Sequence, residues 1–312
     1  MNQSTVNGSW IRATLVNAAK GFLMGAADVV PGVSGGTMAL VLGIYRRLVD
    51  AIRAFDARLL ALLRTARFGA AAGHVDLWFL IQLGAGIASG LLFFTRVVPL
   101  PELIQTQPVP IYSLFFGLIS ASVVVLLRSL GRIRLREGFA LALGCVAGFG
   151  VVNLVPTTTP DAAWFVFISG ALAICAMILP GISGSFVLLI LNKYAYVFDA
   201  IGRLDVAILL PFGLGAVTGL MLFSRLLSWL LNRFYRPTIN VIIGLLLGSL
   251  WVIWPFQTRP GQAAGGEPGI IRSTPYLPDP LQTEVLVAAA CALAGLGFVL
   301  ALERLAGALG PR

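Results

Sequence analysis

Ten long apolar stretches, separated by short polar segments, recur along the chain from Thr14 to Ala306. Only 11% of the 312 residues are charged, against about a quarter in an average soluble protein. Crossing the hydrocarbon core of a bilayer takes about 20 apolar residues, and a helix satisfies its backbone hydrogen bonds within such a segment. The chain is therefore expected to fold as an all-α polytopic membrane protein, which excludes a soluble globular domain.

An internal duplication constrains the architecture further. The string PGVSGGTMALVLGIYRRLVDAI at residues 31–52 matches PGISGSFVLLILNKYAYVFDAI at residues 180–201. Downstream, GAGIASGLLFFTR at residues 84–96 matches GLGAVTGLMLFSR at residues 213–225. Repeats of this kind indicate a transporter that is built from two related halves.

The two repeats are expected to divide the chain into residues 1–155 and 156–312. In each repeat the first apolar stretch runs directly into Pro-Gly-x-Ser-Gly, which breaks a helix with almost no loop. We expect the first two stretches of each repeat to form a re-entrant helical hairpin, at about residues 14–52 and 162–201. About three spanning helices then remain per repeat, and this odd number predicts that the two repeats have opposite orientations in the membrane.

The distribution of positive charge supports the inverted arrangement. The chain carries 22 Lys and Arg against 13 Asp and Glu. In the inverted arrangement 17 of the 22 cations lie on the side of the two termini, which makes that side cytoplasmic. The excess is expected to reflect topology, with no nucleic acid partner. Cys145, Cys175 and Cys291 each lie alone in an apolar stretch, so no metal site, disulfide or cofactor is expected.

The interrupted hairpins supply the candidate substrate site. A helix that begins inside the membrane has unpaired N–H groups, and its start, with nearby hydroxyls, favours a phosphate. Two such starts, one per repeat, are expected to face each other near the middle of the membrane. Alternatively, these small residues only cap the turn and allow close helix packing. The residues predicted to line a phosphate site are Ser34, Gly35, Gly36, Thr37, Ser183, Gly184 and Ser185.

Three charged residues are further candidates. Arg96 and Arg225 occupy matching positions near the ends of related stretches, where they either capture a negatively charged headgroup or act as ordinary interfacial arginines. Asp28 lies three residues before Pro31, whereas the second repeat has Met177 at the matching position. Because the hairpin does not require an acid there, we predict that Asp28 couples transport to protons rather than acting as an exposed cap.

An enzymatic function is a weaker alternative. Gly32-Val33-Ser34-Gly35 fits the Gly-x-Ser-Gly pattern of intramembrane serine proteases, and a lipid phosphatase generally uses a histidine nucleophile. His74 is the only histidine and lies in the arginine-rich loop. No Ser–His pair is therefore expected.

The string KGFLMGAADVVPGVSGGTMALVLGIY at residues 20–45, with LPGISGSFVLLILNKY at residues 179–194, resembles the bacterial polyprenyl-phosphate transporter family. The resemblance covers essentially the whole chain. It implies an inverted-repeat flippase, in the cytoplasmic (inner) membrane, that returns undecaprenyl phosphate from the outer to the inner leaflet for cell-envelope synthesis. The chain departs from the usual pattern of the family at Arg46, Arg47, Asn192 and Lys193.

The predicted site suits an anion, and two kinds of transport substrate stay open. A phosphate monoester carries about −1.5 to −2 charges, so moving it inward against an inside-negative potential predicts a proton or another cation as coupling partner.

Two alternatives to a lipid flippase stay open. The first is a transporter or channel for a small inorganic anion, and the second is an intramembrane lipid-modifying enzyme. A groove open to the bilayer would favour the lipid, whereas a closed aqueous path would favour the small anion.

Overall fold

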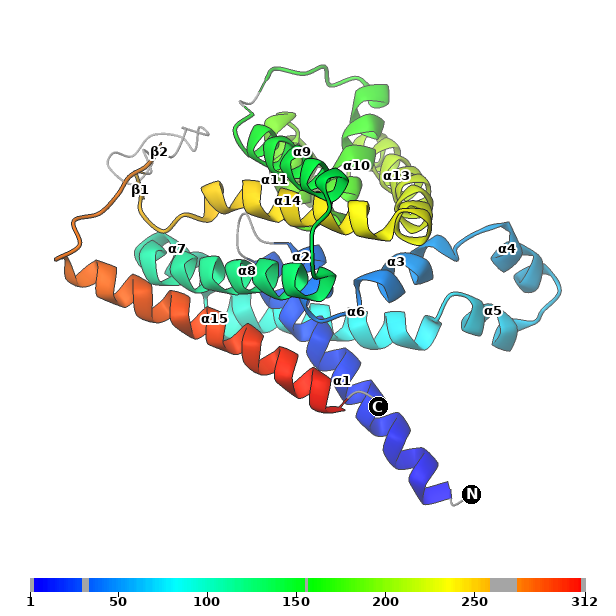
Figure 1. Cartoon of the computed structure of the whole chain (residues 1–312). Coiled ribbons are helices and arrows are strands. Elements are labelled where there is room, and N and C mark those ends of the chain that lie inside the picture. Colours follow the sequence, from blue (N-terminus) through cyan, green and yellow to red (C-terminus); the bar gives the residue numbers. More distant parts are fainter. Residues whose placement is uncertain (1–2, 30–33, 155–156, 259–273, 310–312) are drawn as a thin grey trace.

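The structure is a computed structural model that describes residues 3–29, 34–154, 157–258 and 274–309 (Figure 1). Pro31, Gly32 and Val33 of the first motif lie outside the described residues. The helices before residue 155 are α1 (Gln3–Asp28), α2 (Gly35–Val41), α3 (Tyr45–Arg53), α4 (Ala57–Arg64), α5 (Phe68–His74), α6 (Leu77–Leu92), the π-helical turn η1 (Phe93–Val97), α7 (Leu100–Thr106), α8 (Pro108–Leu130) and α9 (Leu135–Val152). The elements after it are α10 (Ala163–Ile178), α11 (Gly184–Ile190), α12 (Tyr194–Arg203), α13 (Val206–Arg233), α14 (Tyr235–Ile253), the antiparallel strands β1 (Gln257–Thr258) and β2 (Thr274–Pro275), and α15 (Thr283–Leu309).

Six helices of the described chain are long and apolar enough to cross a membrane, three in each repeat. They are α6 continued by η1, then α8, α9, α13, α14 and α15. Large apolar side chains on their outer faces are exposed, such as Val146 of α9 at 71% and Leu210 of α13 at 57%. An exposed apolar surface of this extent is stable in lipid and not in water. The protein is an all-α polytopic membrane protein, as the composition predicts.

The apolar stretches that follow the two Pro-Gly motifs are each broken into two helices. The break between α2 and α3 contains Gly43 with φ 69°, and the break between α11 and α12 contains Asn192 with φ 52°, at the matching position. Glycine and asparagine adopt this left-handed conformation most readily, so Asn192 can end a helix as Gly43 does. α11 and α12 are bent by 108°. The re-entrant hairpins stay a prediction, which these short and bent helices support.

Four helix pairs provide most of the packing. Two of them, the exchanged pairs, join a helix of one repeat to a helix of the other. α1 packs on α6 and α10 on α13, within one repeat, whereas α8 packs on α15 and α9 on α14, across the repeats. Glycines hold these pairs close. A Cβ at Gly86 would lie 2.1 Å from the carbonyl oxygen of Ala18, and a Cβ at Gly215 would lie 1.9 Å from that of Phe167. The matching Gly-x-x-x-Gly patterns that begin at these glycines therefore serve close helix packing.

The two broken stretches are buried to different degrees. The first six residues of α2, Gly35 to Leu40, are all buried, and α3 packs against α13 of the other repeat. In α11 only Leu188 is buried, and Ser185 is exposed. The start of α12 is fixed by Lys193, whose side chain is 1% exposed and whose Nζ lies 2.6 Å from a carboxylate oxygen of Asp161. The first broken stretch therefore lies in the core and the second lies nearer the surface.

An ion pair joins the start of α9 to the start of α14. Arg236 Nε donates to Glu137 Oε1 at 2.6 Å, and its Nη2 donates to Oε2 at 2.9 Å, which makes the pair bidentate. Glu284 of α15 matches Glu137 in the repeat but lines a cavity of about 370 Å³, in which Val109 stands where the arginine would be. The carboxylate of Glu137 is thus engaged in an ion pair, while Glu284 faces a cavity.

Candidate functional site

Ser34 begins α2 inside the protein. Its backbone is extended, with φ −128° and ψ 148°, and its Oγ accepts the N–H of Thr37 at 3.3 Å, as an N-cap residue does. The Oγ atoms of Ser34 and Thr37 lie 3.2 Å apart, and the two residues are 2% and 1% exposed. Two hydroxyls are therefore held side by side, in the interior, at the start of a short helix.

The carboxylate of Asp28 lies at the same helix start. Its Oδ1 accepts the backbone N–H of Gly35 at 2.5 Å. A Cβ at Gly35 would lie 2.7 Å from Asp28 Oδ2, so glycine permits this close approach. A carboxyl group of the chain thus occupies the first N–H of α2, where the sequence predicts a bound phosphate. Met177 supplies no such carboxylate at the matching position of the second repeat.

The first motif contacts the Pro-Gly turn of the second repeat. Thr37 Oγ1 accepts the N–H of Gly181 at 3.0 Å. The hydroxyl of Tyr45 donates to the carbonyl oxygen of Ile178 at 3.2 Å. The structure therefore brings the start of α2 against the segment that precedes α11, although the two are far apart in the sequence.

The remaining three predicted residues, Ser183, Gly184 and Ser185, form the start of α11. The Oγ atoms of Ser183 and Ser185 lie 2.7 Å apart, and Ser183 lines a small cavity with Ser249 of α14. Between the described residues, no hydrogen bond joins these three to the segment from Ser34 to Thr37. That all seven line one phosphate site stays a prediction.

Arg96 and Arg225 lie in different surroundings. Arg96 is exposed in η1, directly after α6. Arg225 of α13 lines a cavity of about 420 Å³ together with Arg53 and Arg58. Our sequence reasoning treated Arg53 and Arg58 only as cytoplasmic charge, because the contact between their loop and α13 leaves no pattern in the sequence.

His74 contacts an acid and not a serine. Its Nε2 lies 3.0 Å from Asp56 Oδ1. The N–H of Leu59 at the start of α4, and then the bond to His74, hold the pKa of Asp56 below its ordinary value. Within the described ranges no group of three or more His, Cys, Asp or Glu could hold a metal ion. The histidine thus has a local role in fixing α4 and α5.

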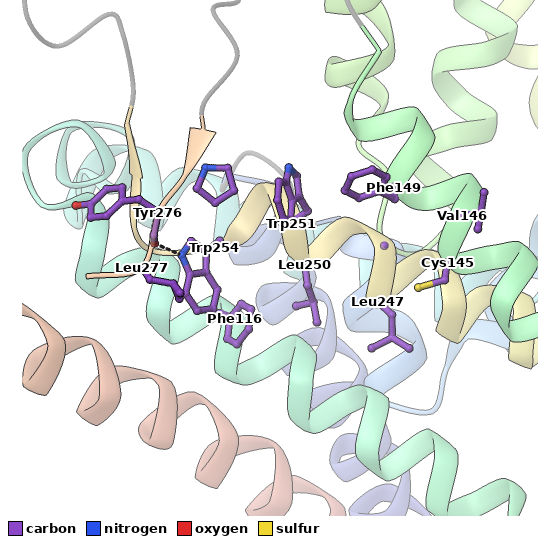
Figure 2. A pocket seen from close by; sticks show the side chains of 12 residues that line it. Phe116, Cys145, Val146, Phe149, Leu247, Leu250, Trp251, Trp254, Tyr276 and Leu277 are labelled. Carbon is purple, nitrogen blue, oxygen red and sulfur yellow. Dashed lines mark hydrogen bonds between the residues drawn. The ribbon is translucent and has the colours of Figure 1, made fainter. Parts of the chain in front are cut away.

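An apolar groove opens between α8, α9, α14 and the segment that follows β2 (Figure 2). Its volume is about 710 Å³. Phe149 packs edge-to-face on Trp251, with ring centroids 5.4 Å apart, and Trp254 Nε1 donates to the carbonyl oxygen of Tyr276 at 3.0 Å. Val146, on the rim, is 71% exposed on the outer face of α9, so the groove opens toward lipid.

α14 connects this aromatic groove to the second motif. Gly248 lines the groove, and the next residue, Ser249, lies beside Gly181, where a Cβ would be 3.1 Å from Ser249 Oγ. Our sequence reasoning missed the groove. The available signal was the pair Trp251 and Trp254, which stand three residues apart near the end of an apolar stretch and so share one face of a helix.

Comparison with known proteins identifies relatives. A family model described as undecaprenyl phosphate translocase-like matches residues 24–264. A protein of Vibrio cholerae serotype O1, named polyprenyl-phosphate transporter, is 44% identical over 242 residues, which cover 76% of this chain and 77% of the relative. A protein of Staphylococcus aureus with the same name is 31% identical over 258 residues, which cover 77% of this chain and 86% of the relative. No solved structure matches the chain.

The names of both relatives confirm the expectation of a transporter rather than an enzyme. The family model spans more than half of the chain and includes both Pro-Gly motifs. The resemblance drawn from residues 20–45 and 179–194 is thereby confirmed, and the chain belongs to the undecaprenyl phosphate translocase-like family.

Proposed function

We propose that the protein is a flippase that returns undecaprenyl phosphate from the outer to the inner leaflet of the bacterial cytoplasmic membrane, for reuse in cell-envelope synthesis. The names of the relatives support a polyprenyl-phosphate substrate. The structural observation that carries the proposal is the aromatic groove of α8, α9 and α14. An apolar lining with a lipid-facing rim suits a prenyl chain that arrives from the bilayer, and it does not suit a hydrated inorganic anion.

The phosphate end of the same lipid is proposed to bind at the two motifs. The predicted lining is formed by Ser34, Gly35, Gly36, Thr37, Ser183, Gly184 and Ser185. The paired hydroxyls at the start of α2 are suitable hydrogen-bond donors for a phosphate, and the N–H of Gly35 becomes one when the carboxyl group of Asp28 releases it. α14 borders both places, since it carries Gly248 in the groove and Ser249 beside Gly181.

The inverted arrangement of the two repeats belongs to this proposal. The exchanged pairs support a two-fold axis that relates α8 on α15 to α14 on α9, and three spanning helices in each repeat favour an axis in the membrane plane. β1 and β2 lie at the opposite end of the helix array from α4 and α5 (Figure 1). The termini, α4 and α5 are then cytoplasmic, and the two strands are external.

Cysteine labelling in cells tests this topology. On a background without Cys145, Cys175 and Cys291, a single cysteine at Leu277, which is 87% exposed, is expected to react with a membrane-impermeant maleimide added outside. A single cysteine at Thr65 is expected to react only after the cells are opened. Labelling with the opposite pattern would exclude the inverted arrangement.

Transport itself is tested in proteoliposomes with undecaprenyl phosphate confined to one leaflet. We expect the protein to move the lipid from the leaflet on its β1–β2 side and to carry no inorganic phosphate.

If Arg96 and Arg225 capture the headgroup on opposite faces, Arg96→Ala slows uptake from the leaflet on the β1–β2 side more than Arg225→Ala does. Equal, small losses would identify both as ordinary interfacial arginines.

The transport assay also decides between the two substrates. If undecaprenyl phosphate does not move between the leaflets while a flux of inorganic phosphate is measured, the substrate is the inorganic anion and not the lipid.

A further inference from the structure

Three arginines from three helices converge on one cavity. Arg53 ends α3, Arg58 lies in the first turn of α4, and Arg225 lies in α13. Together with Asp56 they line a space of about 420 Å³, which is within the usual range for small-ligand sites. Because guanidinium groups repel one another, three of them around an open volume favour the binding of an anion.

Neighbouring side chains fix this arginine cavity. Arg53 Nη1 donates to Ser228 Oγ at 3.0 Å, and Ser228 Oγ donates to Asp50 Oδ1 at 2.7 Å. Ser228 is 1% exposed, so the bond anchors Arg53 to the inner face of α13. Asp56 contributes one negative charge, and its Oδ1 is already bonded to the start of α4 and to His74. The lining therefore keeps an excess of positive charge.

The surface of α13 beside the arginine cavity is apolar and exposed. On α13 the side chains of Leu222, Leu226 and Trp229 are 62%, 49% and 55% exposed. Their spacing places them on one stripe of the helix, next to Arg225. Exposed leucines suit the acyl chains, and a tryptophan near the end of a span is typical of the membrane interface. A ligand with an apolar chain in the bilayer and an anionic head can thus reach the arginines from the side.

We propose that the arginine cavity binds the phosphate of the lipid substrate at the cytoplasmic leaflet. This site rests on the proposed function and deepens it, because it joins Arg53 and Arg58 to Arg225 as a second phosphate site, apart from the motif at Ser34. Guanidinium groups bind phosphate through paired hydrogen bonds, and several of them match its double negative charge. The recognised chemistry is the phosphate group, whose two sources are a lipid headgroup and free phosphate.

Ala57 is a local reporter, because it is exposed and lines the cavity. A single cysteine there, in purified protein lacking Cys145, Cys175 and Cys291, is labelled with a maleimide in the presence of geranyl phosphate, a soluble prenyl phosphate. A single cysteine at Thr65, at the other end of α4, is the control site. We expect geranyl phosphate to slow labelling at Ala57 to a plateau and to leave the rate at Thr65 unchanged.

Arginine variants decide whether the cavity is responsible for this protection. Arg53→Gln combined with Arg225→Gln is expected to raise the half-protecting concentration at least about tenfold. Arg64→Gln combined with Arg67→Gln removes the same charge outside the cavity and is expected to leave that concentration nearly unchanged. If the first pair lowers the melting temperature, Arg58→Gln repeats the measurement with the Ser228 contact intact.

Protection that persists in the cavity variants overturns the proposal, and so does equal protection by geraniol, which lacks the phosphate. If inorganic phosphate protects at the same concentration as geranyl phosphate, the ligand is free phosphate and its assignment to a lipid is wrong. Flipping of undecaprenyl phosphate without protection at Ala57 would remove this site and leave the proposed function standing. Phosphate-dependent protection without flipping would instead remove the proposed function and leave the site.

Discussion

Replacing Asp28 with asparagine is expected to remove the response of transport to an imposed proton gradient while lipid binding persists. Asparagine is uncharged like the protonated carboxyl group, so a phosphate can still displace it from the N–H of Gly35, but it cannot take up and release a proton. The measurement is the initial rate of lipid flipping in proteoliposomes, with and without a pH jump that acidifies the external side.

The expected effect is large because the substrate is charged. Moving about 1.5 to 2 negative charges inward against 100 mV costs about 3.5 to 4.6 kcal/mol. That energy corresponds to a factor of roughly several hundred to a few thousand in the distribution of the lipid between leaflets. Asp28 suits the coupling role because two neighbouring anions disfavour each other. Protonation of Asp28 would free the N–H of Gly35 for the phosphate, so proton and lipid would bind together.

A matched control separates coupling from a general effect of charge. Asp199 is an exposed acid of α12 that lies 4.0 Å from Arg203, and Asp199→Asn is expected to respond to the gradient as the unmodified protein does. A full response in Asp28→Asn would exclude Asp28 as the coupling residue. Glu284, which faces a cavity, would then be tested before Glu137, whose carboxylate is held by Arg236.

Replacing Gly35 with valine is expected to lower the flipping rate at least about a hundredfold, since it blocks backbone approach and removes the Asp28 bond at the same site. The added Cβ would lie 2.7 Å from Asp28 Oδ2. A carboxylate side chain can turn away, so we expect the variant to fold in detergent, with a melting temperature lowered only by the loss of the Asp28 bond. Transport and thermal unfolding, measured on the same preparation, check both parts.

Gly184→Val tests the second motif and is expected to abolish transport as well. Here the added Cβ would lie 2.6 Å from the carbonyl oxygen of Ala173, which is backbone, so α10 and α11 must move apart and the melting temperature is expected to fall. Gly202→Val in α12 is the control, because a Cβ there meets nothing within 4 Å. Near-normal transport in both motif variants would remove the phosphate site from these positions.

The sequence predicts the helices of this protein better than their contacts. α13, at Val206–Arg233, is recognisable as one of the long apolar stretches of the sequence, because crossing lipid imposes length and composition on each segment separately. The sequence did not predict that the apolar stretch after the second Pro-Gly motif consists of two helices bent by 108°, since Asn192 is a weaker signal for a break than glycine.

Contacts between segments that are far apart in the chain were harder to predict from the sequence. The two repeated motifs were expected to face each other; the bond from Gly181 to Thr37 joins parts of them, and a shared phosphate site stays a prediction. The meeting of Arg53 with Arg225, and of Phe149 with Trp251, depends on how whole helices are placed, and neither pair carries a local pattern. The sequence also gives no sign that α2 is buried while α11 is half exposed, because the two motifs are nearly identical.

The exchanged helix pairs have a consequence for biogenesis. A Cβ at Gly144 of α9 would lie 2.1 Å from the carbonyl oxygen of Val241, so this glycine surface is shaped for α14, which the ribosome makes later. Gly117 of α8 likewise fits against Ala292 of α15, which is also made later. The first repeat therefore enters the bilayer as an incomplete bundle and acquires these neighbours only after the second repeat is made. A nascent chain that stops before α15 leaves α8 without its partner, which makes it a target for membrane quality control and not half of a working carrier.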